Sequence, residues 1–197
     1  RGRQVHAVLV VAVVEQGVEV QVVDLGHRGD VAGDGFVHFH MLLAAQPEQP
    51  ELLYESALLA EKLGRQDVLE TNLRKLIRIK PDHAHAYNAL GYSLAERNQR
   101  LAEAEQLIAK ALQLSPDDPF ITDSMGWVLY RKGDTAGALT YLQRAYSIRP
   151  DPEIAAHLGE VLWVVGRRDE AKKTWQEAAK AHPGNEVLTE VIKHFSP

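Results

Sequence analysis

Side chains that could carry out acid, base, nucleophilic or metal chemistry are few in this sequence, and their spacing does not suit catalysis. There is no cysteine, which excludes thiolate nucleophiles, zinc thiolate sites and disulfides. His38 with His40 and His83 with His85 invite a metal hypothesis, but neither pair has the H-E-x-x-H spacing or a well-placed third ligand. Phosphate-binding loops, G-x-S-x-G elbows and G-x-G-x-x-G fingerprints do not occur. The sequence therefore predicts no catalytic residue, no metal site and no cofactor.

The acidic residues that stand out lie beside prolines. Asp82 follows Pro81, while Asp117 and Asp118 follow Pro116. Aspartate is favoured at helix N-caps and in turns, because its carboxylate accepts hydrogen bonds from backbone N–H groups. We therefore expect these three residues to cap helices or form turns rather than to act as catalytic carboxylates.

Charge and hydropathy exclude two kinds of partner. The formal net charge is −5, from 22 Lys and Arg against 27 Asp and Glu, whereas nucleic-acid binding needs a clustered basic face. The longest apolar run, Val5 to Val14, is far shorter than the ~20 residues of a membrane helix, and no signal-peptide cleavage site follows it. We expect neither nucleic-acid binding nor membrane insertion. A chain without cysteine suits the cytoplasm and the periplasm equally well. We expect the cytoplasm if the chain is complete.

Residues 1–49 differ in texture from the rest of the chain. Residues 1–39 contain twelve Val and no Ser, Thr, Lys, Asn, Ile, Pro or Tyr, and a proline-containing stretch follows at residues 46–50. Two interpretations stay open. The valine runs Val5–Val14 and Val18–Leu25 predict a β-hairpin that turns at residues 15–17. Alternatively, the segment is non-native, because such a bias also results when GC-rich DNA is translated in another frame.

A repeat organises the chain from Pro50 onward. Prolines recur at Pro81, Pro116, Pro150 and Pro183, at intervals of 35, 34 and 33 residues, and each ends a helical pattern. Small residues precede each of the last three prolines at nearly fixed distances, where two helices can approach closely, and large apolar residues fill the space between them. The small residues are Gly91, Ala104 and Ala111; Gly126, Ala138 and Ala145; Gly159, Ala171 and Ala178. The large ones are Leu90, Leu94 and Ile108; Met125, Leu129 and Leu142; Leu158, Leu162 and Trp175.

This pattern resembles the tetratricopeptide-repeat (TPR) family, whose unit is a pair of antiparallel helices of about 34 residues. The resemblance implies an all-α fold, in which the pairs stack into a right-handed α-solenoid. The expected units span residues 50–83, 84–117, 119–151 and 152–184, the first matching weakly, and residues 185–197 would form a capping helix. The second-helix markers of the 84–117 unit lie one residue late, so we expect an extra residue in its turn, near Asn98.

Three segments, residues 87–95, 123–133 and 155–163, resemble the C-terminal array of a proteobacterial TPR group. That group includes outer-membrane-associated lipoproteins that act as adaptors for periplasmic proteases and cell-wall hydrolases. The resemblance implies that this chain is a C-terminal fragment of such a protein, and that the full-length relative is periplasmic and attached to the outer membrane.

In the TPR family, the first helix of each pair lines a concave groove that holds peptides. Carried over by position, the partner-binding residues here are His85, Asn88, Tyr92, Phe120, Asp123, Trp127, Tyr130, Arg131, Glu160 and Trp163. We expect the aromatic rings to face solvent and to anchor a ligand, with Asn88 and Arg131 orienting it. The alternative is that some rings pack between neighbouring repeats.

The resulting expectation is a non-catalytic scaffold that binds a peptide or a segment of a partner protein. Two alternatives stay open. The array could associate with copies of itself, or it could be the docking arm of an enzyme whose chemistry lies in residues 1–49.

Overall fold

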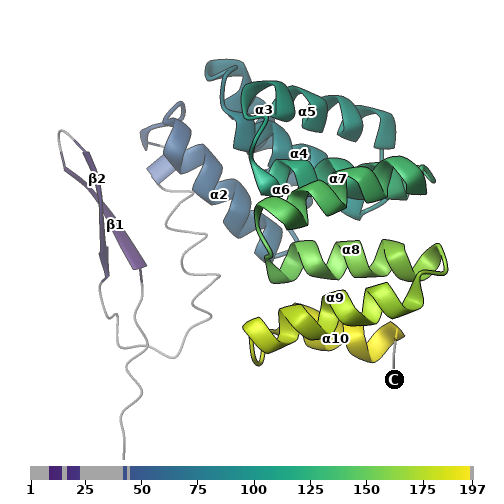
Figure 1. Cartoon of the computed structure of the whole chain (residues 1–197). Helices are drawn as coiled ribbons and strands as arrows, with labels where there is room; N and C mark the ends of the chain where they lie inside the picture. The colour runs from purple at the N-terminus through teal and green to yellow at the C-terminus, as the bar shows by residue number, and fades with distance from the viewer. Residues whose placement is uncertain (1–8, 15–16, 23–41, 44, 196–197) are drawn as a thin grey trace, which may run out of the picture. The chain divides into compact units, whose positions relative to one another are not determined.

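A computed structural model describes residues 9–14, 17–22, 42–43 and 45–195 of the chain (Figure 1). Contacts between residues divide the chain into two compact units, unit 1 (Arg1–Pro81) and unit 2 (Asp82–Pro197). The all-α solenoid expected from the repeat is confirmed, since the chain from Pro50 onward forms successive antiparallel helix pairs. The histidine pair His38 and His40 lies outside the described residues.

The described residues of unit 1 include two strands and one helix pair. Strand β1 (Leu9–Val14) pairs antiparallel with β2 (Gly17–Val22), and the turn residues 15 and 16 lie outside the described part. Helices α2 (Pro50–Lys62) and α3 (Gln66–Ile79) pack against each other. Helix α2 begins with a proline, which suits the first helical position, and the side chain of Gln49 accepts a hydrogen bond from Leu52 N at 2.9 Å.

Unit 2 consists of three further helix pairs and a final helix. The pairs are α4 (Ala84–Glu96) with α5 (Leu101–Leu114), α6 (Pro119–Arg131) with α7 (Thr135–Ile148), and α8 (Pro152–Val164) with α9 (Arg168–Ala181). The first helices α4, α6 and α8 contact one another in that order. Helix α10 (Glu186–Phe195) packs against α8 and α9. Three first helices and α10 therefore share one face of the unit, and that face holds the candidate site.

Caps and glycines fix where these helices start and turn. The carboxylate of Asp118 accepts hydrogen bonds from Phe120 N at 2.9 Å and Ile121 N at 3.1 Å, which confirms its predicted capping role. Asp134 and Asp151 cap α7 and α8 in the same way. Gly133, in the turn between α6 and α7, has a φ of 90°, which a residue without Cβ adopts at little cost.

The turn between α4 and α5 contains the extra residue expected there. It spans residues 97–100, whereas the corresponding turns span residues 132–134 and 165–167. Asn98 and Arg100 take φ values of 54° and 45° to accommodate it, a left-handed conformation that is uncommon for residues with a Cβ.

Each helix pair of unit 2 has a glycine on its first helix that faces a large side chain on its second helix. A Cβ placed on Gly91 would meet Ile108 at 2.6 Å, and one placed on Gly126 would meet Leu142 at 2.6 Å. On Gly159 it would overlap the indole ring of Trp175, which is almost fully buried. The small residues of the repeat therefore set the distance between paired helices, as the spacing predicts.

Hydropathy along the helices gives no sign of a bilayer-spanning element. Among the described residues, none of the helices is both long and apolar enough to cross a membrane.

We predict that Gly126→Ala destabilises the protein while Gly137→Ala does not. The new Cβ at Gly126 would crowd Leu142, which is fully buried, and the carbonyl oxygen of Ala138 at 3.1 Å, and overpacking of this kind costs about 1–3 kcal/mol. At Gly137 the group displaced is the surface carboxylate of Asp134, so the lost cap is offset by the helix propensity of alanine, each about 1 kcal/mol. Urea unfolding followed by circular dichroism compares the two variants. Equal stabilities would contradict the tight crossing at Gly126.

Candidate functional site

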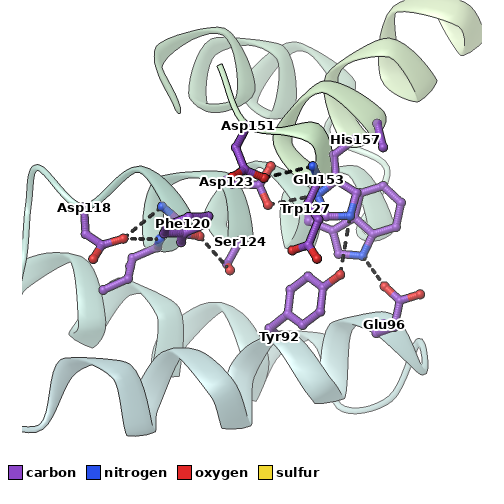
Figure 2. Close-up of polar contacts among 12 residues, drawn as sticks. Tyr92, Glu96, Asp118, Phe120, Asp123, Ser124, Trp127, Asp151, Glu153 and His157 are labelled. Carbon is purple, nitrogen blue, oxygen red and sulfur yellow. Dashed lines mark hydrogen bonds and ion pairs between the residues drawn. The ribbon is translucent and has the colours of Figure 1, made fainter. Parts of the chain in front are cut away.

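A chain of polar contacts crosses the three first helices of unit 2. His157 on α8 lies between Asp123 on α6 and Tyr92 on α4 (Figure 2). Its Nδ1 is 2.9 Å from Asp123 Oδ2, and its Nε2 is 3.4 Å from the hydroxyl of Tyr92. Only 15% of the His157 side chain and 8% of the Asp123 side chain are exposed. The pair therefore connects neighbouring repeats in a poorly solvated environment.

The indole ring of Trp127 packs onto this chain. It stacks on His157 with ring centroids 4.2 Å apart, and its N–H donates to Glu96 Oε2 at 2.7 Å. The guanidinium of Arg131 lies 5.7 Å from the centre of the indole and donates to the carbonyl oxygen of Glu96 at 3.1 Å. Aromatic stacking and a charge-assisted hydrogen bond thus hold Trp127 in one position.

Tyr130 extends the same network toward α8. Its hydroxyl donates to Glu160 Oε1 at 3.2 Å, and the centroids of its ring and the Trp127 ring are 5.3 Å apart. Burial, followed by the negative charge and the hydrogen bond of Glu160, raises the pKa of Tyr130, while Arg131 acts in the opposite direction. The phenol therefore remains a hydrogen-bond donor at neutral pH.

The pKa of His157 lies above its ordinary value. Burial is the largest single effect and lowers the pKa, because it disfavours the charged imidazolium. The charge and hydrogen bond of Asp123, with the charges of Glu96 and Glu160, together outweigh burial and raise it. His157 is thus held toward its charged form by acidic groups from all three first helices.

A pocket of about 470 Å³ lies next to this network. Helix α10 supplies one wall, and α4, α6 and α8 supply the remainder. The residues that line it are Glu96, Trp127, Ala156, His157, Glu160, Glu186, Val187, Glu190 and Val191. The volume is in the range of protein pockets that bury a ligand, and the lining combines apolar surface with a few polar groups.

The structure brings together five of the ten residues predicted from the repeat pattern to bind a partner: Tyr92, Asp123, Trp127, Tyr130 and Glu160. Arg131 adjoins them through Glu96 and Trp127. Asn88, on α4, has a buried side-chain oxygen without a hydrogen-bond partner among the described residues.

Three of the predicted binding residues lie in other surroundings. His85 lies 3.7 Å from Asp118, and the ring of Phe120 lies under the guanidinium of Arg149 at 5.1 Å. Trp163 packs against Trp175 and Phe195. These contacts hold the ends of the helices, and none of the three residues lines the pocket.

The prediction that the aromatic rings face solvent is wrong for Trp127, which is only 4% exposed. Asp123 is also buried. The physical reason is the close contact between first helices of neighbouring repeats, which encloses side chains at these positions. Loss of the Trp127 ring would leave a cavity and destabilise the fold. Trp127 therefore contributes little surface to the pocket. Its ring packs between neighbouring repeats, which is the alternative given in the sequence analysis.

His157 is the residue of this network that the repeat pattern missed. Two signals were present in the sequence: His157 precedes Glu160 by three residues, and Glu186 precedes Glu190 by four, so each pair shares one helix face. Neither signal indicates which other helix that face meets.

We predict that the contribution of His157 to stability falls as the pH rises. A group whose pKa is higher in the folded state stabilises the fold below its unfolded pKa of about 6.5 and loses that effect as the pH passes the folded value. The difference in unfolding free energy between the wild type and His157→Gln should therefore be larger near pH 6 than near pH 9. Urea unfolding at both values measures it. A difference that is constant or grows with pH would show that His157 is not held in its charged form.

The described residues contain no group of three or more His, Asp or Glu placed to hold a metal ion.

Comparison with known proteins agrees with the repeat fold that the structure shows. The family model for the tetratricopeptide repeat matches residues 69–119. The TPR repeat-containing protein PA4667 of Pseudomonas aeruginosa is 52% identical over 118 residues, which are 60% of this chain and 20% of that protein. Protein FlbA of Caulobacter vibrioides is 25% identical over 155 residues, 75% of this chain and 24% of its own length. The chain thus spans a fifth to a quarter of these relatives.

Solved structures show the same fold. The thermophilic TPR protein TTC0263 of Thermus thermophilus has a TM-score of 0.74 at 23% identity, covering 83% of this chain and 90% of its own. MamA has a TM-score of 0.61 at 20% identity, covering 76% of this chain and 88% of its own. YrrB, described as a TPR protein with an unusual peptide-binding site, has a TM-score of 0.57 at 21% identity. The match covers 79% of this chain and 82% of YrrB. With the paired helices and their glycine contacts, these similarities show that this chain has the fold of tetratricopeptide-repeat proteins, and residues 69–119 match the family model itself.

Proposed function

We propose that unit 2 is a non-catalytic scaffold that binds a segment of another protein on the face formed by α4, α6, α8 and α10. The observation that carries the proposal is the pocket of about 470 Å³ on this face. Its floor is built from side chains that already have fixed partners, including Trp127 and His157. A preformed site of this kind places most of the ordering cost on the ligand, so a short segment should bind at roughly micromolar strength.

Two buried acceptor atoms belong to residues of this face that do not line the pocket. Asn88 Oδ1 and Asp123 Oδ1 have no hydrogen-bond partner among the described residues, and an unmade hydrogen bond at a buried group is costly. A peptide-binding site is attributed to YrrB, which shares the fold.

The narrower role that we propose is an adaptor in the bacterial cell envelope that serves a protease or a cell-wall hydrolase. It rests on the resemblance of residues 87–95, 123–133 and 155–163 to proteobacterial adaptor arrays. The relative in Pseudomonas aeruginosa is a bacterial protein that contains TPR repeats, and this chain spans a fifth of it. Further repeats in a longer protein would add contacts and tighten the binding of a long partner.

The test is to fill the pocket without disturbing the core. Val187 lines the pocket and is 41% exposed, so Val187→Trp should occupy the space while leaving the helices folded. Gln143→Trp, on the exposed surface of α7, is the matched control. Peptides selected from a random peptide array on the wild-type chain should bind the control normally and the Val187→Trp chain at least ~10-fold more weakly.

Thermal melts of both variants check that the fold is retained. Binding that is equal on the two variants, or an array that yields no bound peptide, would contradict a ligand site in this pocket.

A further inference from the structure

The glutamates of unit 2 fall into two groups. Those on the second helices have cationic partners: Glu103 with Arg100, Glu105 with Lys132, Glu170 with Arg167 and Glu177 with Lys173. The other five, Glu96, Glu153, Glu160, Glu186 and Glu190, form no ion pair with Lys or Arg within the described residues, and four of these five line the pocket. Unpaired carboxylates are thus concentrated at the candidate binding face.

The pocket lacks a compensating basic side chain. Its lining contains no Lys or Arg, and its histidine is already paired with Asp123. The guanidinium of Arg131, which lies over the Trp127 ring, is bonded to the carbonyl oxygen of Glu96. Like charges in a concave, partly desolvated site reinforce one another and focus a negative potential. The pocket therefore carries a charge that a ligand of opposite sign would neutralise.

The arrangement fits an elongated cation better than a metal ion. The four carboxylates come from three helices, and they do not converge on one point as metal ligands do. The lining also includes the apolar residues Ala156, Val187 and Val191. Lysine and arginine side chains combine an aliphatic stem with a charged head, and so match a lining that combines apolar and acidic side chains.

We propose that the pocket between α8 and α10 selects partner segments that present a lysine or arginine flanked by apolar residues. This inference rests on the proposed function and names the ligand class of the same site. The stem of the basic side chain lies along Val187 and Val191, and its head reaches the carboxylates of Glu160, Glu186 and Glu190. Glu160 and Glu96 also accept hydrogen bonds from Tyr130 and Trp127, which keep two of the carboxylates in place.

The test uses three labelled peptides of one frame, Gly-Ala-Leu-Xaa-Ala-Leu-Xaa-Ala-Leu-Gly, in which Xaa is Arg, Gln or Glu. Fluorescence anisotropy measures binding to the full chain. We expect the Arg peptide to bind at least ~10-fold more tightly than the Gln peptide, and the Glu peptide more weakly than both. The preference should shrink between roughly 0.1 M and 1 M salt, where the screening length falls from about 10 to 3 Å.

Two double variants locate the effect. Glu186→Gln with Glu190→Gln removes two pocket charges from exposed positions on α10, so the fold should be retained. Glu170→Gln with Glu177→Gln removes the same charge from α9, outside the pocket. The pocket variant should lose at least ~5-fold of its affinity for the Arg peptide, and the α9 variant less than ~2-fold.

The outcomes separate this inference from the proposed function. Equal binding of the Arg and Gln peptides, with both blocked by Val187→Trp, would overturn the charge preference and leave the binding face standing. Equal losses in the two double variants would attribute the effect to net charge and also overturn the inference. Failure of all three peptides to bind would overturn the inference, and the proposed function would fall only if the peptide array also yielded no ligand.

Discussion

The contact between Asp123 and His157 is the interaction on which the candidate binding face of unit 2 depends. It joins the first helices of two neighbouring repeats, and the Tyr92 hydroxyl extends it to a third. A charged or strongly polarised hydrogen bond in a poorly solvated place is worth more than one on the surface, and leaving either partner alone there would be costly. The indole of Trp127 stacks on the same imidazole. The position of each first helix is thus coupled to that of the next through one histidine ring.

That coupling explains how a stack of helix pairs can present a preformed pocket. Within a pair, a glycine facing Ile108, Leu142 or Trp175 fixes the separation of the two helices. Between pairs, the side chains of α4, α6 and α8 fix the distances between these three first helices. Helix α10 packs against the last pair. The carboxylates that raise the pKa of His157 include Glu96 and Glu160, which also line the pocket. The acidic groups that favour the charged form of His157 therefore also line the pocket in which we propose that a ligand binds.

Much of the fold was predictable from the sequence, because a repeat displays its packing rules several times. The small residues, the helix-ending prolines, the extra turn residue near Asn98 and the cap at Asp118 all follow from local spacing. The site was predictable only in part. Position in the repeat identifies which helix face a residue occupies, but not how closely the neighbouring repeat approaches it. Trp127 was therefore expected in solvent and is buried, while His157 was overlooked. The wall contributed by α10 depends on how the last helix packs, which the repeat pattern does not encode.

The most direct test of this account is a double-mutant cycle between Asp123→Asn and His157→Gln, with urea unfolding of the wild type and the three variants near pH 6. If the pair holds neighbouring first helices together, the two substitutions should be non-additive, with a coupling energy of about 1 kcal/mol or more. Effects that add to within about 0.3 kcal/mol would show that the two residues act independently, and would contradict the claim that their contact holds the binding face in place.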